Sequence, residues 1–264
     1  MSSTTPVSGS AQRWGALWGA RSRDWAETEA HQVPTYEEAI RRIGISPGQS
    51  FLDVGCGSGV FLELAARRGA TVAGIDASEA LAALARDRVP GADVRVGDME
   101  HLPYADASFD VVCGFNSFFF ADDMTAALRE AARVARPGAA VVIQVWGRPE
   151  RCGIEPAKAA IGRLLPGPGR AAPPPFWKPG VLERHAEAAG LTPETSFDHA
   201  WAYDYADEPA LLRSLLSSAP AVVAARSSGE QAVRDAIRDA MAPHRTAGGG
   251  YRVENEWHYL VARA

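Results

Sequence analysis

The stretch FLDVGCGSG, residues 51–59, decides the fold of this 264-residue chain. Its first four residues are mostly apolar and are typical of a short buried strand. Three alternating glycines follow, and then Phe61, Leu64 and Ala65 share one face of a helical pattern. Glycine lets the backbone approach a ligand closely, because no side chain obstructs it. The stretch predicts a strand, a ligand-binding turn and a helix, a signal that several nucleotide cofactors would satisfy.

Outward from this turn, short apolar runs alternate with helical spacing. The last of these helices has Met124 and Val134 on its apolar face and is expected to end at Arg136-Pro137-Gly138. Such alternation is typical of βαβ units around a parallel sheet. The predicted strands cover residues 51–54, 71–75, 94–96, 111–113, 140–143, 195–205 and 251–264.

The segments around this core differ in composition. Residues 11–29 carry Trp14, Trp18 and Trp25 on one face if they form one helix, and a short helix over 35–43 follows. This face either packs on the core or closes a site as a lid. We predict a tail and Trp-rich helical lid over 1–45 and the main domain over 46–264. Within that domain we predict a loop over the Pro-rich residues 148–180 and a helical insertion over 207–248, both as parts of a substrate cap.

Acidic residues follow the second and third predicted strands. Asp76 could accept hydrogen bonds from both hydroxyls of a ribose, although a helix N-cap is the plainer role. Asp98 and Met99 could meet the amino group and ring of an adenine, or form a turn and a core contact. The dinucleotide fingerprint Gly-x-Gly-x-x-Gly requires glycine at position 60, where this chain has Val60. The spacing therefore disfavours NAD.

Four motifs occur together in a fixed order: FLDVGCGSG (51–59), VAGIDAS (72–78), VGDMEHLPYADASFDVV (96–112) and LREAARVARPGA (128–139). With them the chain resembles the class I S-adenosylmethionine-dependent methyltransferases. It is most similar to the small-molecule group that includes ubiquinone and menaquinone biosynthesis enzymes. The resemblance spans residues 46–146. It implies an α/β fold: a Rossmann-like, seven-stranded, doubly wound sheet, mostly parallel with an antiparallel last strand, plus helical cap elements.

The resemblance also implies a set of cofactor-binding residues. Asp53, Gly55 and the neighbouring backbone would hold the methionine portion of S-adenosylmethionine, and Asp76 the ribose. Asp98 would bond the adenine amino group, with Met99 on the ring. Cys56 would contribute its backbone and not a thiol nucleophile. The full predicted set is Asp53, Gly55, Cys56, Gly57, Asp76, Ala77, Asp98, Met99 and Phe115.

The acceptor side is less defined. The aromatic loop 115–120 should border the methyl group, but it carries phenylalanines where many relatives have a histidine. The catalytic base is therefore unknown, and His31 and His258 are the candidates that could reach a pocket. The predicted substrate pocket comprises Trp18, Tyr36, Asn116, Phe118 and Trp146.

Composition excludes several classes of partner. The net charge of −5 gives no footprint for nucleic acid, and residues 116–119 lack the Asn-Pro-Pro-Tyr pattern of amino-methylating nucleic-acid enzymes. No apolar run is long enough for a membrane span. Three cysteines without CxxC spacing disfavour a disulfide framework and fit a cytoplasmic location. No metal-ligand spacing occurs, so we expect no metal. The oligomeric state is unknown.

These observations predict a methyltransferase that moves a methyl group from S-adenosylmethionine to a small organic molecule of specialised metabolism by direct in-line displacement, releasing S-adenosylhomocysteine. Two alternatives stay open: an NAD(P)-dependent oxidoreductase, and a non-methylating protein that binds S-adenosylmethionine. The accepting atom, whether oxygen, nitrogen or carbon, is not defined by the sequence.

Overall fold

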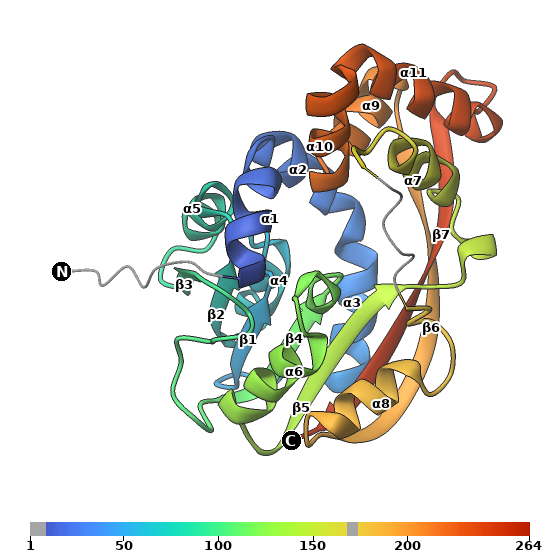
Figure 1. The fold of residues 1–264 in the computed structure, drawn as a ribbon. Helices are drawn as coiled ribbons and strands as arrows, with labels where there is room; N and C mark the ends of the chain where they lie inside the picture. The colour runs from blue at the N-terminus through green and yellow to red at the C-terminus, as the bar shows by residue number, and fades with distance from the viewer. Residues whose placement is uncertain (1–8, 168–173) are drawn as a thin grey trace.

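The computed structural model describes residues 9–167 and 174–264 of the protein (Figure 1). A seven-stranded sheet with the order β3-β2-β1-β4-β5-β7-β6 forms its centre. Neighbouring strands from β3 to β5 are parallel, and β7 is antiparallel to both β5 and β6. The predicted fold class is confirmed. The strands are β1 Ser50–Val54, β2 Thr71–Asp76, β3 Asp93–Val96, β4 Phe109–Phe115, β5 Ala135–Trp146, β6 Thr192–Tyr205 and β7 Tyr251–Arg263.

Helices cover both faces of the sheet, and each face has its own apolar core. Residues of α3 (Val33–Ile43), α4 (Val60–Ala66) and α5 (Glu79–Arg88) join the core on one face. Residues of α6 (Met124–Val134) and α8 (Val181–Ala188) join the core on the other face. The central strands are apolar on both sides because both sides are covered.

The remaining helices gather beyond the carboxyl ends of the parallel strands (Figure 1). Helix α11 contacts α7, α9 and α10. The N-terminal helices reach this group, since α1 contacts α10 and α2 contacts α9, while both also contact α5. These helices are α1 Gly9–Gly19, α2 Ser22–Glu29, α7 Glu155–Gly162, α9 Glu208–Leu216, α10 Ala219–Ser228 and α11 Glu230–Met241. Short 3₁₀ turns are η1 Ala30–Gln32, η2 Phe118–Phe120, η3 Pro149–Arg151 and η4 Ala242–His244.

The N-terminal segment does not meet the condition of one helix over 11–29, because it forms two helices. Helix α1 ends at Gly19, a poor helix former, and Arg21 leaves helical geometry with φ −135° and ψ 44°. The break still brings the three indoles together. Trp18 lies 4.7 Å from Trp25 between ring centroids, and Trp14 and Trp18 both pack edge-on against Phe120.

Two predicted boundaries were wrong. Residues 148–180 do not form a loop throughout, because they contain η3 and α7. Pro156 lies in the first turn of α7, where a missing N–H costs nothing; residues 168–173 fall outside the described part of the chain. Helix α6 ends at Val134, before Arg136-Pro137-Gly138, which belong to β5. A residue that precedes proline favours extended backbone, so the strand begins early.

Candidate functional site

The glycine turn between β1 and α4 has a backbone that requires glycine. Gly55, Gly57 and Gly59 have φ values of 82°, 54° and 82°, in the left-handed region. The Gly55 and Cys56 N–H groups donate to the carbonyl of Ile75 at 2.7 and 3.0 Å, which ties the turn to β2. A Cβ on Gly55 would overlap the Ser117 side chain. Residues 55–59, called the glycine loop below, therefore lie between the ends of β2 and β4.

Two carboxylates accept hydrogen bonds from backbone N–H groups of the glycine loop, and a third carboxylate lies nearby. Asp76 accepts hydrogen bonds from the Gly57 N–H at 2.9 Å and the Ser78 N–H at 2.8 Å. Glu29, the last residue of α2, accepts from the Ser58 N–H at 2.8 Å and the Ser58 hydroxyl at 2.7 Å. Asp53 lies at the end of β1 with 3% exposure. Three acidic side chains thus converge on one turn.

Burial controls the protonation of these carboxyls. It raises the pKa of Glu29 to about 7 and the pKa of Asp76 to about 6, because an ionised carboxylate loses water there. The pKa of Asp53 is also raised by burial and by the neighbouring Glu29 and Asp76. Arg88 on α5 opposes part of this effect at Glu29. The arrangement favours a ligand that brings positive charge.

The predicted adenine residues lie beside the N-terminus of α1. Asp98 is buried, and its carboxylate accepts from the Glu100 N–H at 2.9 Å and the Ser10 hydroxyl at 3.3 Å. Met99 packs against the apolar core on the α6 side of the sheet. Asp98 follows β3 and Asp76 is the last residue of β2, so the two carboxylates stand at neighbouring strand ends.

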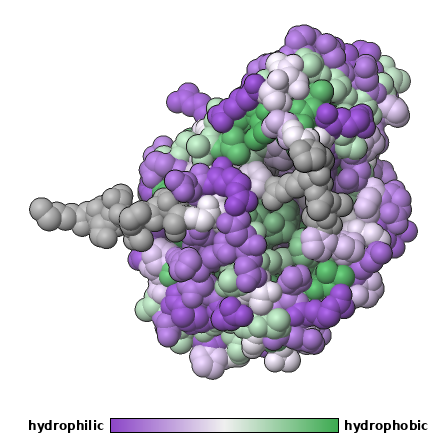
Figure 2. Space-filling model, in the orientation of Figure 1, coloured by the Kyte–Doolittle hydropathy of each residue, from purple (hydrophilic) through white to green (hydrophobic). Residues whose placement is uncertain are grey.

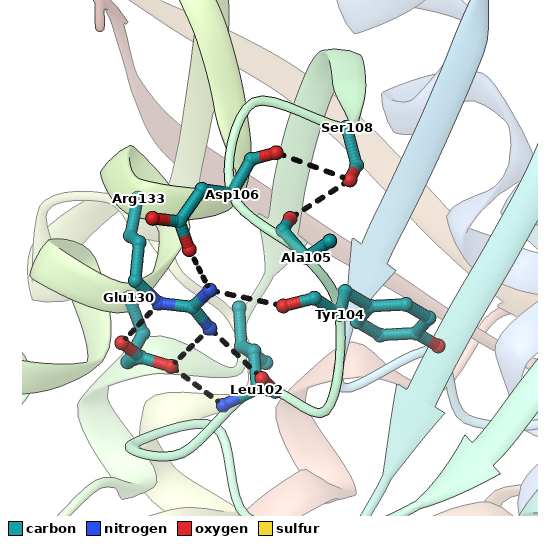
Figure 3. A network of polar contacts seen from close by, with 7 residues as sticks. All are labelled: Leu102, Tyr104, Ala105, Asp106, Ser108, Glu130 and Arg133. Atoms are coloured by element: carbon teal, nitrogen blue, oxygen red, sulfur yellow. Dashed lines mark hydrogen bonds and ion pairs between the residues drawn. The ribbon is translucent and has the colours of Figure 1, made fainter.

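An arginine network fixes the chain that follows Asp98 (Figure 3). Arg133 on α6 donates to the carbonyl oxygens of Leu102 and Tyr104, each at 2.9 Å, and pairs with Glu130 at 2.7 Å. Glu130 in turn accepts from the Leu102 N–H at 2.8 Å. The two motifs at 96–112 and 128–139 therefore depend on each other. Their shared role is to hold the connection between β3 and β4.

Helix α1 lies directly on the segment that follows β2. A Cβ on Gly15 would overlap the carbonyl oxygen of Ala77, and one on Gly19 would stand 2.6 Å from the Ser78 hydroxyl. The Trp14 indole N–H donates to the Phe120 carbonyl at 3.0 Å. The candidate ribose and adenine residues are thus next to α1. Sequence reasoning missed Glu29 and Ser10, which belong to no motif, and it gave Ser58 of the 51–59 motif no role; the four-residue spacing of Gly15 and Gly19 was the available signal for close packing.

Several aromatic side chains lie at the carboxyl ends of β4 and β5. Phe115 contacts Tyr36 of α3 with ring centroids 4.7 Å apart, and Trp146 stacks on Trp257 at 5.4 Å. In the space-filling view the molecule is hollowed between the cap helices and the sheet, with apolar residues in part of the hollow (Figure 2). Asn116, which follows Phe115, has a left-handed backbone with φ 52°. Its backbone N–H donates to the backbone carbonyl of Gln144 at 3.0 Å.

Several polar atoms in this region are buried without a hydrogen-bond partner among the described residues. Buried polar groups are normally paired, so each of these atoms has a hydrogen bond that the described chain does not supply. Gln144 uses only its amide N–H, which donates to the Tyr259 hydroxyl at 2.6 Å. The unpartnered atoms are His31 Nδ1, Gln32 Oε1, Asn116 Oδ1 and Nδ2, Gln144 Oε1 and Trp257 Nε1. His258 Nε2 is unpartnered as well, but His258 lies on the opposite face of the sheet with its ladder partner Val145.

The predicted pocket residues fall into separate places. Tyr36, Asn116 and Trp146 belong to the region just described. Trp18 packs on Phe120 instead, with centroids 5.5 Å apart. Phe118 is buried in the core on the α6 side of the sheet. Tyr36 and Trp146 thus pack on the α3 side of the sheet and Phe118 on the opposite side.

The two histidine candidates have different surroundings. His31 stacks on Tyr203 with centroids 5.2 Å apart, and burial lowers its pKa. His258 on β7 has its Nδ1 atom 2.7 Å from Asp198 Oδ1 of β6, which leaves Nε2 buried and unpartnered. Its neighbour across the ladder is Val145, one residue before the end of β5. His258 is therefore held by a carboxylate near the carboxyl edge of the sheet.

Two further expectations concern metals and membranes. Among residues 9–167 and 174–264 no group of three or more possible metal ligands occurs. In the same part of the chain, no helix has the length and apolar character to cross a membrane. The cysteines Cys56, Cys113 and Cys152 are buried and unpaired.

Comparison with known proteins identifies the family of the sheet domain first. Residues 52–143 match the family described as "Methyltransferase domain". The methyltransferase GfsG of Streptomyces halstedii is 42% identical over 114 residues, which are 40% of this chain and 41% of that protein. The 27-O-demethylrifamycin SV methyltransferase of Amycolatopsis mediterranei is 32% identical over 200 residues, or 69% of this chain and 70% of that protein. The chain thus spans less than half of the first relative and over two thirds of the second.

Likeness of structure extends over the cap as well. The solved structure of the [4+2]-cyclase SpnF superposes with a TM-score of 0.64 at 20% identity and covers 99% of this chain and 98% of its own. At that identity the likeness concerns the fold alone. The similarity to the rifamycin enzyme, together with a family match whose residues include Asp53, Asp76 and Asp98, shows that the chain belongs to the S-adenosylmethionine-dependent methyltransferases.

Proposed function

We propose that the glycine loop binds S-adenosylmethionine and that the protein transfers its methyl group to a small organic molecule of specialised metabolism. One observation carries this proposal: the Gly57 and Ser58 N–H groups donate to Asp76 and Glu29. In a dinucleotide site such amides would hold a phosphate. Here the carboxylates of Asp76 and Glu29 already accept hydrogen bonds from these N–H groups. Their negative charge would repel a pyrophosphate and attract a sulfonium and an ammonium.

Each part of the cofactor has a suitable group in this proposal. Asp76 accepts from the ribose hydroxyls and Asp98 from the adenine amino group, with Met99 on the ring. Asp53 and the backbone of Gly55 hold the methionine portion, and Phe115 lies beside it. The chemistry supplied by the bound cofactor is in-line displacement at a methyl carbon. Holding the reacting atoms collinear can lower the barrier by about 7 to 11 kcal/mol, so no metal is invoked.

The acceptor is proposed to be a small molecule because the unpartnered polar atoms lie among aromatic side chains. Such a mixture of apolar surface and a few polar groups is typical of small-molecule sites. Two relatives point the same way, since one is a 27-O-demethylrifamycin SV methyltransferase and another a dTDP-amino-sugar N,N-dimethyltransferase. We also place the protein in the cytoplasm, which its unpaired cysteines support.

His258 is the stronger of the two candidates for a general base. Asp198 fixes its Nδ1 atom, so the other ring nitrogen is free to accept a proton. His258 and Asn116 are both cross-strand neighbours of the end of β5, through Val145 and Gln144, and both carry unpartnered side-chain atoms. Neighbouring strands are about 4.8 Å apart, so the two residues stand about 10 Å apart across the sheet.

The test is transfer of label from methyl-labelled S-adenosylmethionine to a panel of phenols, hydroxylated macrolactones and amino sugars. We expect labelled product with at least one hydroxylated acceptor, and none with a Gly57→Val variant. Retained binding of S-adenosylmethionine without transfer to any class would instead support a non-methylating role for the cofactor.

A further inference from the structure

Glu29 joins the N-terminal helices to the glycine loop. Its side chain is 2% exposed, although it lies at the end of a surface helix. Its Oε2 atom accepts two hydrogen bonds from Ser58, and a Cβ on Gly57 would stand 2.9 Å from the same atom. A carboxylate from outside the sheet domain is thus built into the proposed cofactor turn.

The charged groups around Glu29 are mostly of its own sign. Arg88 of α5 is the cation that faces it; its guanidinium donates to the Ser58 carbonyl at 2.9 Å and to the Ser58 hydroxyl at 3.5 Å. Because Arg88 is already bonded to the loop, it offsets Glu29 only in part. The other titratable groups that interact with Glu29 are Tyr36 of α3, Asp53 of β1, Cys56 of the glycine loop and Asp76 of β2.

We propose that Glu29 is a specificity-determining residue that distinguishes S-adenosylmethionine from S-adenosylhomocysteine by charge. This inference rests on the proposed function. Both molecules carry an ammonium and a carboxylate, but only the methylated one carries a sulfonium. Its net charge is one unit more positive. A buried carboxylate beside the loop interacts more strongly with the charged cofactor, and loss of the methyl group removes that attraction when the product must leave.

Linkage gives this inference a pH signature. Burial raises the pKa of Glu29 to about 7, so a large share of Glu29 is neutral below that pH in the free protein. A positive ligand favours the ionised form, lowers the pKa and releases a proton on binding. Affinity for S-adenosylmethionine therefore rises with pH up to about pH 8 and then levels. Asp76, with a pKa of about 6, adds to the rise at its lower end.

Calorimetric titration of the full chain with each molecule between pH 6 and pH 8.5 tests the inference. For the wild type we expect the Kd of S-adenosylmethionine to fall about tenfold from pH 6 to pH 8, and that of S-adenosylhomocysteine to fall less than about threefold. Glu29→Gln keeps an acceptor for Ser58 but cannot ionise. It should flatten the pH dependence and bring the two affinities about fivefold closer. Glu27→Gln, an exposed change on the same helix, should behave as wild type.

Two results would overturn the inference: equal pH dependence for both molecules in the wild type, or an unchanged affinity ratio in Glu29→Gln. If Glu29→Gln does not fold, proton release by the wild type decides, measured in two buffers of different ionisation enthalpy. Release must accompany the methylated cofactor and be smaller with the product. A wild type that binds neither molecule contradicts the proposed function itself.

Discussion

The glycine loop and the carboxyl end of the β4-β5-β7 group differ in how their polar groups are satisfied. At the glycine loop, the Gly57 and Ser58 N–H groups already donate to protein carboxylates. At the β4-β5-β7 end, Asn116, Gln144 and His258 keep buried atoms without a partner in the described chain. The hydrogen bonds of the first region are formed without a ligand, as expected of a preorganised site for an invariant cofactor. The second leaves its hydrogen bonds to the acceptor.

The two regions also differ in charge. Three carboxylates surround the loop, whereas aromatic rings such as Tyr36, Trp146 and Trp257 lie on the Gln144 face of the second region and His258 lies on the opposite face. A change near the loop should therefore alter cofactor affinity, and a change near β7 should alter turnover with affinity preserved. The following variants test that separation.

The largest effect is expected for His258→Gln. With an oxygen acceptor, turnover should fall by about 10² to 10⁴, the usual contribution of a general base, while S-adenosylhomocysteine affinity is unchanged. Turnover with the acceptor found in the transfer assay, measured against pH, checks this. Asp198→Asn should show a smaller loss of the same kind. Normal turnover with an unaltered pH profile would assign the His258–Asp198 pair a structural role.

A smaller effect is expected for Asp76→Ala on the cofactor side. Loss of the ribose contact should weaken S-adenosylhomocysteine binding by about 1 to 3 kcal/mol, or roughly 5- to 150-fold in Kd. Calorimetry against Asp87→Ala, an exposed acid on α5, gives the comparison. Equal affinities in the two variants would remove Asp76 from ribose recognition.

The smallest functional effect is expected for Arg133→Met, which tests whether a family motif serves the fold. Losing its bonds to the Leu102 and Tyr104 carbonyls should lower the free energy of unfolding by about 1 to 3 kcal/mol, with little change in cofactor affinity once folded. Urea unfolding beside Arg129→Met, an exposed change on the same helix, measures it. If Arg133→Met instead weakens cofactor binding while the free energy of unfolding is unchanged, the motif belongs to the binding site.

Local patterns predicted most of the fold. The strand–turn–helix unit at 51–66 and the other βαβ units depend on neighbouring residues, so periodicity and glycine spacing were sufficient. The break at Arg21 was missed although Gly19 is a poor helix former, and helix α7 was missed because its packing against α11 and not local propensity determines it. Glu29 reaches Ser58 across 29 positions and Ser10 reaches Asp98 across 88, and no local spacing encodes such contacts.

The central claim is that carboxylates on the glycine loop select a cationic cofactor over a dinucleotide. Its most direct test is calorimetric titration of the wild-type protein at pH 8 with S-adenosylmethionine and with NADP⁺ under the same conditions. We predict saturable binding of S-adenosylmethionine at one site per chain and no binding of NADP⁺. Saturable binding of NADP⁺ without binding of S-adenosylmethionine would contradict the claim.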